Sequence, residues 1–249
     1  MNSLVKYYDS AAKSFNEFWA YSDEFVLNIV EDIEQTLRFR NADTFVDIGC
    51  GTGLYTTRLI TRSKSKFSTI AVDISKGMLN EFPPSENLTK LHMSASEFAK
   101  GKVRFDKALL KEVMHHIKDK TEVVNSLCKN LNPNGVILFI ISPVIVNYPL
   151  FVKALELRQN TKSIEPMIIE LLQTQGLRVS VHSKSYPVTF STVKFLTMVR
   201  GRYLSFLSNF SNVELEEGIK EMKSKFANCK TISFTEDYIF IKGVKAGAL

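Results

Sequence analysis

The chain has 249 residues, of which 45% are apolar and 23% charged, so it can bury a full core as one large domain or two small ones. This composition excludes a disordered or low-complexity protein. The 32 lysine and arginine residues exceed the 26 acidic residues by six, an excess too small to indicate a nucleic-acid-binding protein. Cys50, Cys128 and Cys229 form no CxxC pair, which disfavours a disulfide framework or a zinc ribbon and fits a reduced, cytoplasmic setting without a bound metal.

Residues 1–40 are predicted to be helical, because Tyr8, Phe15 and Trp19 fall with other apolar residues at spacings of three and four. The same segment carries acidic residues such as Asp9 and has no arginine before Arg38. A secretory signal needs an uncharged apolar stretch and a transit peptide is rich in arginine, so neither is expected here.

Five short apolar runs, rich in β-branched residues, alternate with helical patterns in the next part of the chain. They cover residues 44–48, 68–73, 88–93, 105–110 and 136–141. Continuous apolar runs of this kind favour a parallel sheet covered on both faces, and the alternation predicts βαβ units. The last run continues toward Val152 but is interrupted by Pro143 and Pro149, so we expect a buried strand and a loop rather than a membrane span.

The alternation weakens after Pro143, and residues 151–226 are predicted to be mostly helical, with Ser191 and Ser211 as helix N-caps. Residues 231–244 alternate again and predict a late strand. The predicted fold is therefore α/β, a Rossmann-like sheet in a single domain. Its parts are N-terminal helices (1–40), a binding core (41–143), a helical lid (144–230) and a returning strand (231–245).

A glycine-rich turn follows the first predicted strand, in the sequence Asp47-Ile-Gly49-Cys-Gly51-Thr-Gly53. Glycine suits a place where the backbone turns sharply into a helix and passes close to a ligand. Asp73 ends the next strand 20 residues after Gly53, where a carboxylate can accept hydrogen bonds from ribose hydroxyls. The glycines are spaced G-x-G-x-G, which differs from the G-x-G-x-x-G fingerprint of dinucleotide-binding proteins.

The pattern D-x-G-x-G-x-G resembles motif I of the class I methyltransferases that depend on S-adenosylmethionine (SAM). Three later segments resemble further motifs of that family in the same order: residues 71–75 followed by Met78, residues 105–117, and residues 131–139. The resemblance implies a class I methyltransferase fold, SAM as the cofactor and S-adenosylhomocysteine as the product.

The resemblance also implies a position for each part of SAM. The loop glycines should line its methionine and ribose, Asp47 should orient the loop or meet the amino group, and Asp73 should bind the ribose hydroxyls. Ser94 stands where the family often has an aspartate for the adenine amino group, which puts the adenine contacts in doubt. The full set of implied cofactor contacts is Tyr8, Phe15, Asp47, Gly49, Cys50, Gly51, Gly53, Asp73, Ile74, Met78, Ser94, Ala95 and Lys111.

Methyl transfer from a sulfonium needs an aligned nucleophile and, for some acceptors, a base. His115 and His116, preceded by Glu112, are the candidate catalytic residues because imidazole titrates near neutral pH. Either histidine could instead shape the pocket, and a carboxylate or amine acceptor needs no base.

The lid is expected to select the acceptor. Arg200 and Arg202 lie two residues apart in a predicted helix, so at most one can face inward, and Arg202 shares its stripe with Phe195 and Met198. Arg202 would then bind a substrate carboxylate. The candidate substrate contacts are Arg202, Phe195, Met198 and Trp19. In overall plan the chain is similar to the trans-aconitate and juvenile hormone acid methyltransferases.

Three functions are compatible with these patterns. The first is methylation of an oxygen or nitrogen of a small molecule such as a carboxylic acid, by a monomer or homodimer without nucleic acid. The second is methylation of RNA or protein, although Leu110-Lys-Glu-Val113 replaces the NPPY-type tetrad that base amino-group methyltransferases usually have. The third is a non-catalytic SAM-binding subunit, which degenerate glycines would favour, and here the glycines are intact.

Overall fold

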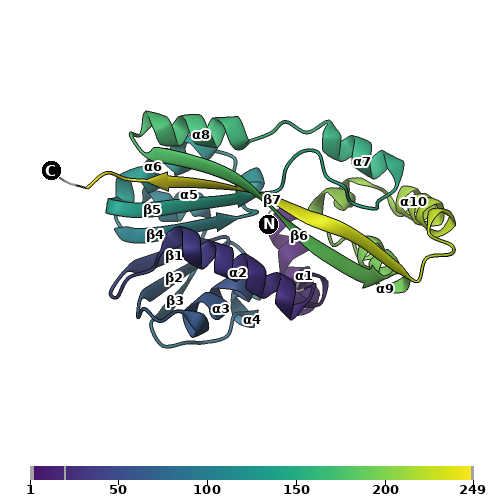
Figure 1. Ribbon diagram of the computed structural model, residues 1–249, viewed down its shortest axis with the longest axis horizontal. Helices are drawn as coiled ribbons and strands as arrows, with labels where there is room; N and C mark the ends of the chain where they lie inside the picture. The colour runs from purple at the N-terminus through teal and green to yellow at the C-terminus, as the bar shows by residue number, and fades with distance from the viewer. Residues whose placement is uncertain (1–2, 20, 248–249) are drawn as a thin grey trace. The chain divides into compact units, whose positions relative to one another are not determined.

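The computed structural model describes residues 3–19 and 21–247, without the side chains of residues 3, 4 and 19 (Figure 1). The chain divides into two compact units. The first takes in residues 1–141, 164–183 and 239–249, and the second takes in residues 142–163 and 184–238.

One sheet of seven strands has the order β3-β2-β1-β4-β5-β7-β6. Strands β1 to β5 run parallel to one another, and β7 pairs antiparallel with β5. The strands are β1 (Thr44–Ile48), β2 (Ser68–Asp73), β3 (Leu88–His92), β4 (Phe105–Lys111), β5 (Leu131–Ile141), β6 (Arg178–Ser191) and β7 (Thr231–Val244). This arrangement confirms the predicted Rossmann-like α/β fold with its late strand returning to the sheet.

Helices cover both faces of the sheet in the first unit, as the apolar runs predicted. The helices here are α1 (Ser3–Trp19), α2 (Asp23–Leu37), α3 (Leu54–Arg62), α4 (Lys76–Glu81), α5 (Ala95–Lys100), η1 (Met114–His116), α6 (Lys120–Asn130) and α8 (Glu165–Thr174). Val46 and Ile48 of β1 share one buried cluster with residues of α5, α6 and α8. Figure 1 shows α2 and α3 on the other face. Because both faces are covered, the ends of the strands are where polar side chains can gather around a ligand.

The second unit contains α7 (Val152–Gln159), α9 (Thr192–Arg200), η2 (Ser205–Asn209), α10 (Asn212–Lys225) and the adjoining parts of β6 and β7. Phe151 is buried against Phe210, whose ring lies 5.2 Å away, and against Gly218 of α10. A Cβ at Gly218 would come within 2.4 Å of the Phe151 ring, so only glycine lets the ring lie this close to the helix. None of the helices described is long and apolar enough to span a membrane.

Strand β6 was not expected, because residues 151–226 were predicted to be mostly helical. Its second half alternates regularly, with Tyr186, Val188 and Phe190 buried and their neighbours exposed. Its first half is almost entirely exposed because β6 is the edge strand of the sheet. An edge strand with polar residues on both faces lacks the apolar alternation that marks a strand in a sequence.

The structure also corrects the helix that was expected to carry both arginines. Helix α9 begins at the predicted cap, Ser191, but ends at Arg200. Arg202 has a φ of 55°, its amide donates to Val199 O, and the amide of Tyr203 donates to Met198 O. This pair of hydrogen bonds around one left-handed residue closes a Schellman motif, which stops the helix. Arg202 therefore does not continue the stripe of Phe195 and Met198.

Candidate active site

The glycine loop joins β1 to α3, and all three of its glycines have a positive φ. A Cβ at Gly49 would lie 2.5 Å from the Val113 side chain, and one at Gly53 would lie 2.4 Å from the Phe82 ring. A Cβ at Gly51 would meet nothing within 4 Å. Gly49 and Gly53 are therefore required by the packing of the protein itself, whereas the space above Gly51 is open to a ligand.

Asp73 lies at the end of β2, and both of its oxygens face the loops around it. Its Oδ2 accepts a hydrogen bond of 2.8 Å from the Gly51 amide, and its Oδ1 accepts one of 2.8 Å from the Ser75 amide. Burial raises the pKa of Asp73, and these amide donors oppose the rise. The carboxylate thus stands directly beside the open space at Gly51, and the binding of ribose there stays a prediction.

Asp47 at the end of β1 is a buried carboxyl group, and Thr56 Oγ1 donates a hydrogen bond to its Oδ2. Burial raises the pKa of Asp47 to about 7, the charge of Asp73 adds to the rise, and the Thr56 and Lys111 side chains oppose it. A cationic ligand beside Asp47 would favour its ionised form. The site therefore offers two carboxyl groups to a ligand that carries hydroxyl groups and positive charge.

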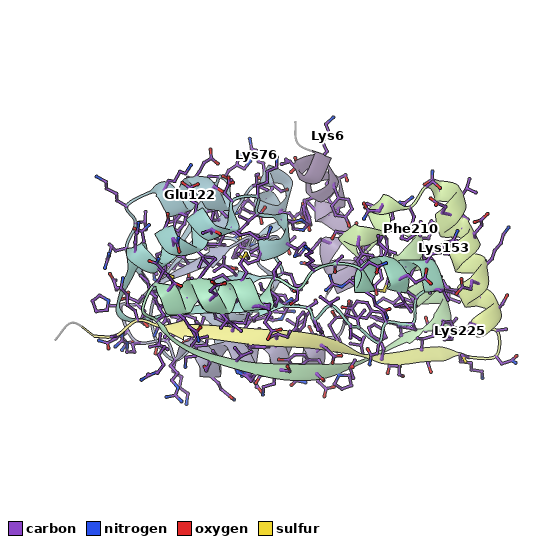
Figure 2. All side chains as sticks on the ribbon, turned by 90° about the horizontal axis from the view of Figure 1, so that it is seen from above. Lys6, Lys76, Glu122, Lys153, Phe210 and Lys225 are labelled. Atoms are coloured by element: carbon purple, nitrogen blue, oxygen red, sulfur yellow. The ribbon has the colours of Figure 1, made fainter. Side chains whose placement is uncertain are left out.

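Helix α1 is fastened over these loops by polar contacts that were not predicted. Asp9 Oδ1 accepts hydrogen bonds from Ser75 Oγ (2.6 Å) and from the Gly77 amide (2.9 Å). Thr52 Oγ1, in the glycine loop, donates to Asn16 Oδ1 at 2.6 Å. Figure 2 shows α1 beside the start of α4, with the labelled Lys6 and Lys76 extending outward on that side. Polar side chains along α1, from Asp9 to Asn16, thus hold the helix against the loops that follow β1 and β2.

A third contact of α1 links Tyr8, a predicted cofactor contact, to His116, a candidate catalytic residue. The Tyr8 hydroxyl and His116 Nε2 are 2.7 Å apart, although the residues are 108 positions apart in the sequence. Burial lowers the pKa of His116 to about 3, and the charge of the neighbouring His115 adds to this, so the imidazole is neutral at pH 7. Burial raises the pKa of Tyr8, and the charges of Tyr7, Asp73 and Glu112 raise it further. The pair is therefore uncharged and stands within the electrostatic influence of Asp73.

The structure distinguishes the two histidines that the sequence left equivalent. His115 is exposed, whereas His116 is partly buried and bonded to Tyr8. Glu112, just after β4, has a φ of 53°, which is strained for a residue other than glycine. Such strain is common where a loop presents side chains to a ligand. Of the two histidines, His116 is the better candidate for a catalytic role.

The other residues that the family resemblance proposed for the cofactor surround the same loops, and their contacts with SAM stay predictions. Met78 is buried in α4, Ile74 follows Asp73, and Lys111 Nζ lies 4.6 Å from the centre of the Tyr55 ring. Ser94 and Glu97 form a capping box that begins α5, so the Ser94 hydroxyl already has a structural role next to Ala95. Phe15 and Cys50 are partly buried, in α1 and in the glycine loop.

Among the proposed substrate contacts that the structure describes, none is positioned as a carboxylate-binding arginine. Phe195 and Met198 are fully buried in α9. The guanidinium of Arg202 donates to Leu207 O and to Asn212 Oδ1, and that of Arg200 pairs with Glu216. The side chain of Trp19 lies outside the described residues. The structure gives no support for a carboxylate-binding arginine at these positions.

A family model described as a methyltransferase domain matches residues 18–165, more than half of the chain. The chain belongs to the methyltransferase family. The matched range contains β1 to β5, the glycine loop, Asp73 and His116. This family is SAM-dependent, and the open space above Gly51, flanked by Asp73, fits that cofactor.

One relative of known sequence matches part of this methyltransferase. An uncharacterized methyltransferase of Schizosaccharomyces pombe is 27% identical over an alignment of 128 residues, and the match covers 45% of this chain and 44% of that protein. The methyltransferase therefore spans less than half the length of this relative.

Two solved structures show the same fold. Phosphoethanolamine N-methyltransferase 2 of Haemonchus contortus, in complex with phosphomonomethylethanolamine and S-adenosylhomocysteine, has a TM-score of 0.62 and 19% identity over 99% of this chain and 61% of that one. The [4+2]-cyclase SpnF has a TM-score of 0.57 and 11% identity over 89% of this chain and 81% of that one. At these identities the likeness concerns the fold, and SpnF shows that the fold also carries another activity.

Proposed function

We propose that this protein transfers the methyl group of SAM to an oxygen or nitrogen atom of a small-molecule acceptor and releases S-adenosylhomocysteine. The observation that carries the proposal is the attachment of α1 to the loops that follow β1, β2 and β4, through Asn16, Asp9 and Tyr8 respectively. A helix bonded to these loops would obstruct a folded RNA or protein chain more than it would obstruct a small acceptor. This is the reason to prefer a small molecule over a macromolecular acceptor.

We propose that Tyr8 and His116 accept the proton that the acceptor loses. Bound SAM supplies a methyl group that is already activated on a sulfonium. Neutral His116 can accept a proton at Nε2, and Tyr8 can take the acceptor's proton while it passes its own to His116. A base with a pKa of about 3 is weak, but it suffices for a group that becomes strongly acidic as it gains the methyl group. For an acceptor without a proton to lose, the pair would hold it in line with the methyl group.

The nature of the acceptor is a further part of the proposal. The Haemonchus enzyme is named for methylating a phosphorylated amine, and the fold match covers 99% of this chain and 61% of that enzyme, which supports a small metabolite as the acceptor here too. The second unit takes in most of residues 144–230, including Phe195 and Met198, and we propose that it selects the acceptor. Cys50, Cys128 and Cys229 are all free thiols, which supports a cytoplasmic setting.

The test is transfer of label from methyl-labelled SAM into a cell extract that has been separated into RNA, protein and small-molecule fractions. We expect label in the small-molecule fraction alone, in proportion to the amount of enzyme. The Gly51→Val variant is the control, because it should bind no cofactor and transfer nothing. Label in RNA or protein would contradict the small-molecule acceptor, and label in no fraction would contradict methyl transfer itself.

A further inference from the structure

Ser75 is a fully buried residue that joins three segments at the end of β2. Its amide donates a hydrogen bond of 2.8 Å to Asp73 Oδ1. Its hydroxyl donates to Asp9 Oδ1 (2.6 Å) and accepts a hydrogen bond of 3.1 Å from the Met78 amide, which makes it the N-cap of α4. A serine hydroxyl has one proton to donate, and Asp9 receives it. Asp9 therefore fixes the side chain of a buried residue that it reaches from another helix.

The same oxygen of Asp9 also binds the start of α4. Asp9 Oδ1 accepts a hydrogen bond of 2.9 Å from the Gly77 amide. A Cβ at Gly77 would lie 3.0 Å from both Cα and Oδ1 of Asp9, so glycine lets α1 lie close enough for this contact. The hydrogen bonds from Ser75 and from Gly77 lower the pKa of the Asp9 carboxyl group. Asp9 is thus ionised at neutral pH and holds both donors with charge-assisted hydrogen bonds.

Through Ser75, Asp9 is linked to the carboxylate that is predicted to bind ribose. Asp73 accepts an amide hydrogen bond on each oxygen, from Ser75 on Oδ1 and from Gly51 on Oδ2. A carboxylate oxygen has two lone-pair sites, so each oxygen of Asp73 can still accept a hydroxyl donor. The direction of these remaining sites depends on how the two amides hold the carboxylate. A shift of Ser75 would therefore turn Asp73 away from the open space at Gly51.

We propose that Asp9 is a positioning residue for SAM: by holding Ser75, it keeps Asp73 in the orientation that binds the ribose hydroxyls. This role rests on the proposed function, because it requires SAM to bind at Asp73. The other two contacts that attach α1 serve different loops. Asn16 binds the glycine loop after β1, and Tyr8 binds the segment after β4. Asp9 alone among these three contacts bonds to the residue that holds Asp73.

The test measures the binding of S-adenosylhomocysteine by calorimetry, which needs no acceptor. Asp9→Ala removes the oxygen that receives both donors, and we expect it to weaken binding about tenfold. Asp9→Asn keeps an oxygen at that position and loses only the charge, so its binding should stay within about threefold of the wild type. Glu17→Ala is the matched control, because Glu17 is an exposed acidic residue of the same helix, and its binding should equal that of the wild type.

A double variant shows whether Asp9 acts through Asp73. Asp73→Ala alone should weaken the binding of S-adenosylhomocysteine. Adding Asp9→Ala should then weaken it by less than about twofold more, because the carboxylate that Asp9 positions is gone. If Asp9 only stabilised α1, Asp9→Ala would weaken binding by the same factor with and without the Asp73 carboxylate.

Gly77→Ala tests the same contact from α4 and decides the matter if Asp9→Ala does not fold. The added Cβ would press against Cα and Oδ1 of Asp9. Alanine is a better helix former than glycine, so α4 itself should not be weakened. We expect S-adenosylhomocysteine to bind more weakly to this variant than to the wild type, because α1 and α4 are pushed apart.

Three results would overturn the positioning role. They are unchanged binding in Asp9→Ala (or in Gly77→Ala, where Asp9→Ala does not fold), equal weakening in Asp9→Ala and Asp9→Asn, and the same Asp9→Ala loss with and without the Asp73 carboxylate. The proposed function is tested separately by the labelled-SAM assay. Transfer of label together with unchanged binding in Asp9→Ala would leave that function standing and remove the role of Asp9. Failure of the wild-type protein to bind S-adenosylhomocysteine would remove both.

Discussion

Replacing Gly51 with valine is expected to abolish SAM binding, with a loss of affinity of roughly 100-fold or more, or about 2.7 kcal/mol. The valine side chain would enter the only part of the glycine loop where an added Cβ meets no protein atom within 4 Å. SAM is predicted to occupy that space. Titration calorimetry with SAM measures the loss, and circular dichroism checks that the variant is folded.

The control for this variant is Gly176→Val, in the turn between α8 and β6. Gly176 has a φ of 74° and, like Gly51, has nothing within 4 Å of an added Cβ. The two substitutions therefore share the strain of a left-handed β-branched residue, about 1–2 kcal/mol or somewhat more, but Gly176 belongs to no predicted ligand contact. Gly176→Val should bind SAM normally. If Gly51→Val also bound SAM normally, the placement of the cofactor on the loop would be wrong.

Replacing His116 with alanine is expected to lower kcat by roughly 100-fold or more and to leave SAM affinity within about threefold. The substitution removes the nitrogen that holds the Tyr8 hydroxyl and accepts a proton, whereas the cofactor contacts lie at Gly51 and Asp73. Single-turnover rates with labelled SAM separate the chemical step from binding.

Two further variants show whether Tyr8 and His116 act as one unit. Tyr8→Phe should lose nearly as much activity as His116→Ala, and the double variant should lose little more than either, because a pair that acts together gives non-additive losses. His115→Ala, which changes the exposed histidine, should lose no more than about threefold. Additive losses, or equal losses at His115 and His116, would remove the proton-relay role.

The fold and the cofactor loops could be predicted because their signals are local in the sequence. The runs at 44–48 and 68–73 agree with β1 and β2, and the glycine spacing already located the turn that the structure shows. Strand β6 could not be found in this way, because its exposed first half carries no apolar alternation. The end of α9 had a usable signal, since Gly201 follows Arg200 directly and glycine is common where helices stop.

The contacts that assemble the site depend on how α1 lies against the sheet, which no local pattern encodes. Asp9 reaches Ser75 and Gly77, and Tyr8 reaches His116, across 66 to 108 residues of sequence. The sequence placed Tyr8 and Phe15 near the cofactor only through the family resemblance. It left His115 and His116 equivalent, because adjacent histidines differ in burial and partners only after the chain has folded.

Calorimetric titration of SAM into the wild-type and Asp73→Ala proteins shows whether Asp73 and the glycine loop bind SAM. The wild-type chain should bind one SAM, and the variant should bind it about 1.5–3 kcal/mol more weakly, as expected for the loss of a charge-assisted hydrogen bond. Asp106→Ala is the matched control, because Asp106 also accepts a main-chain hydrogen bond, from Thr44, but lies at the opposite end of the strands. Its SAM affinity should equal that of the wild type. Equal SAM affinity in wild-type and Asp73→Ala would show that Asp73 does not bind the cofactor, and no SAM binding by the wild-type chain would contradict the cofactor site as a whole.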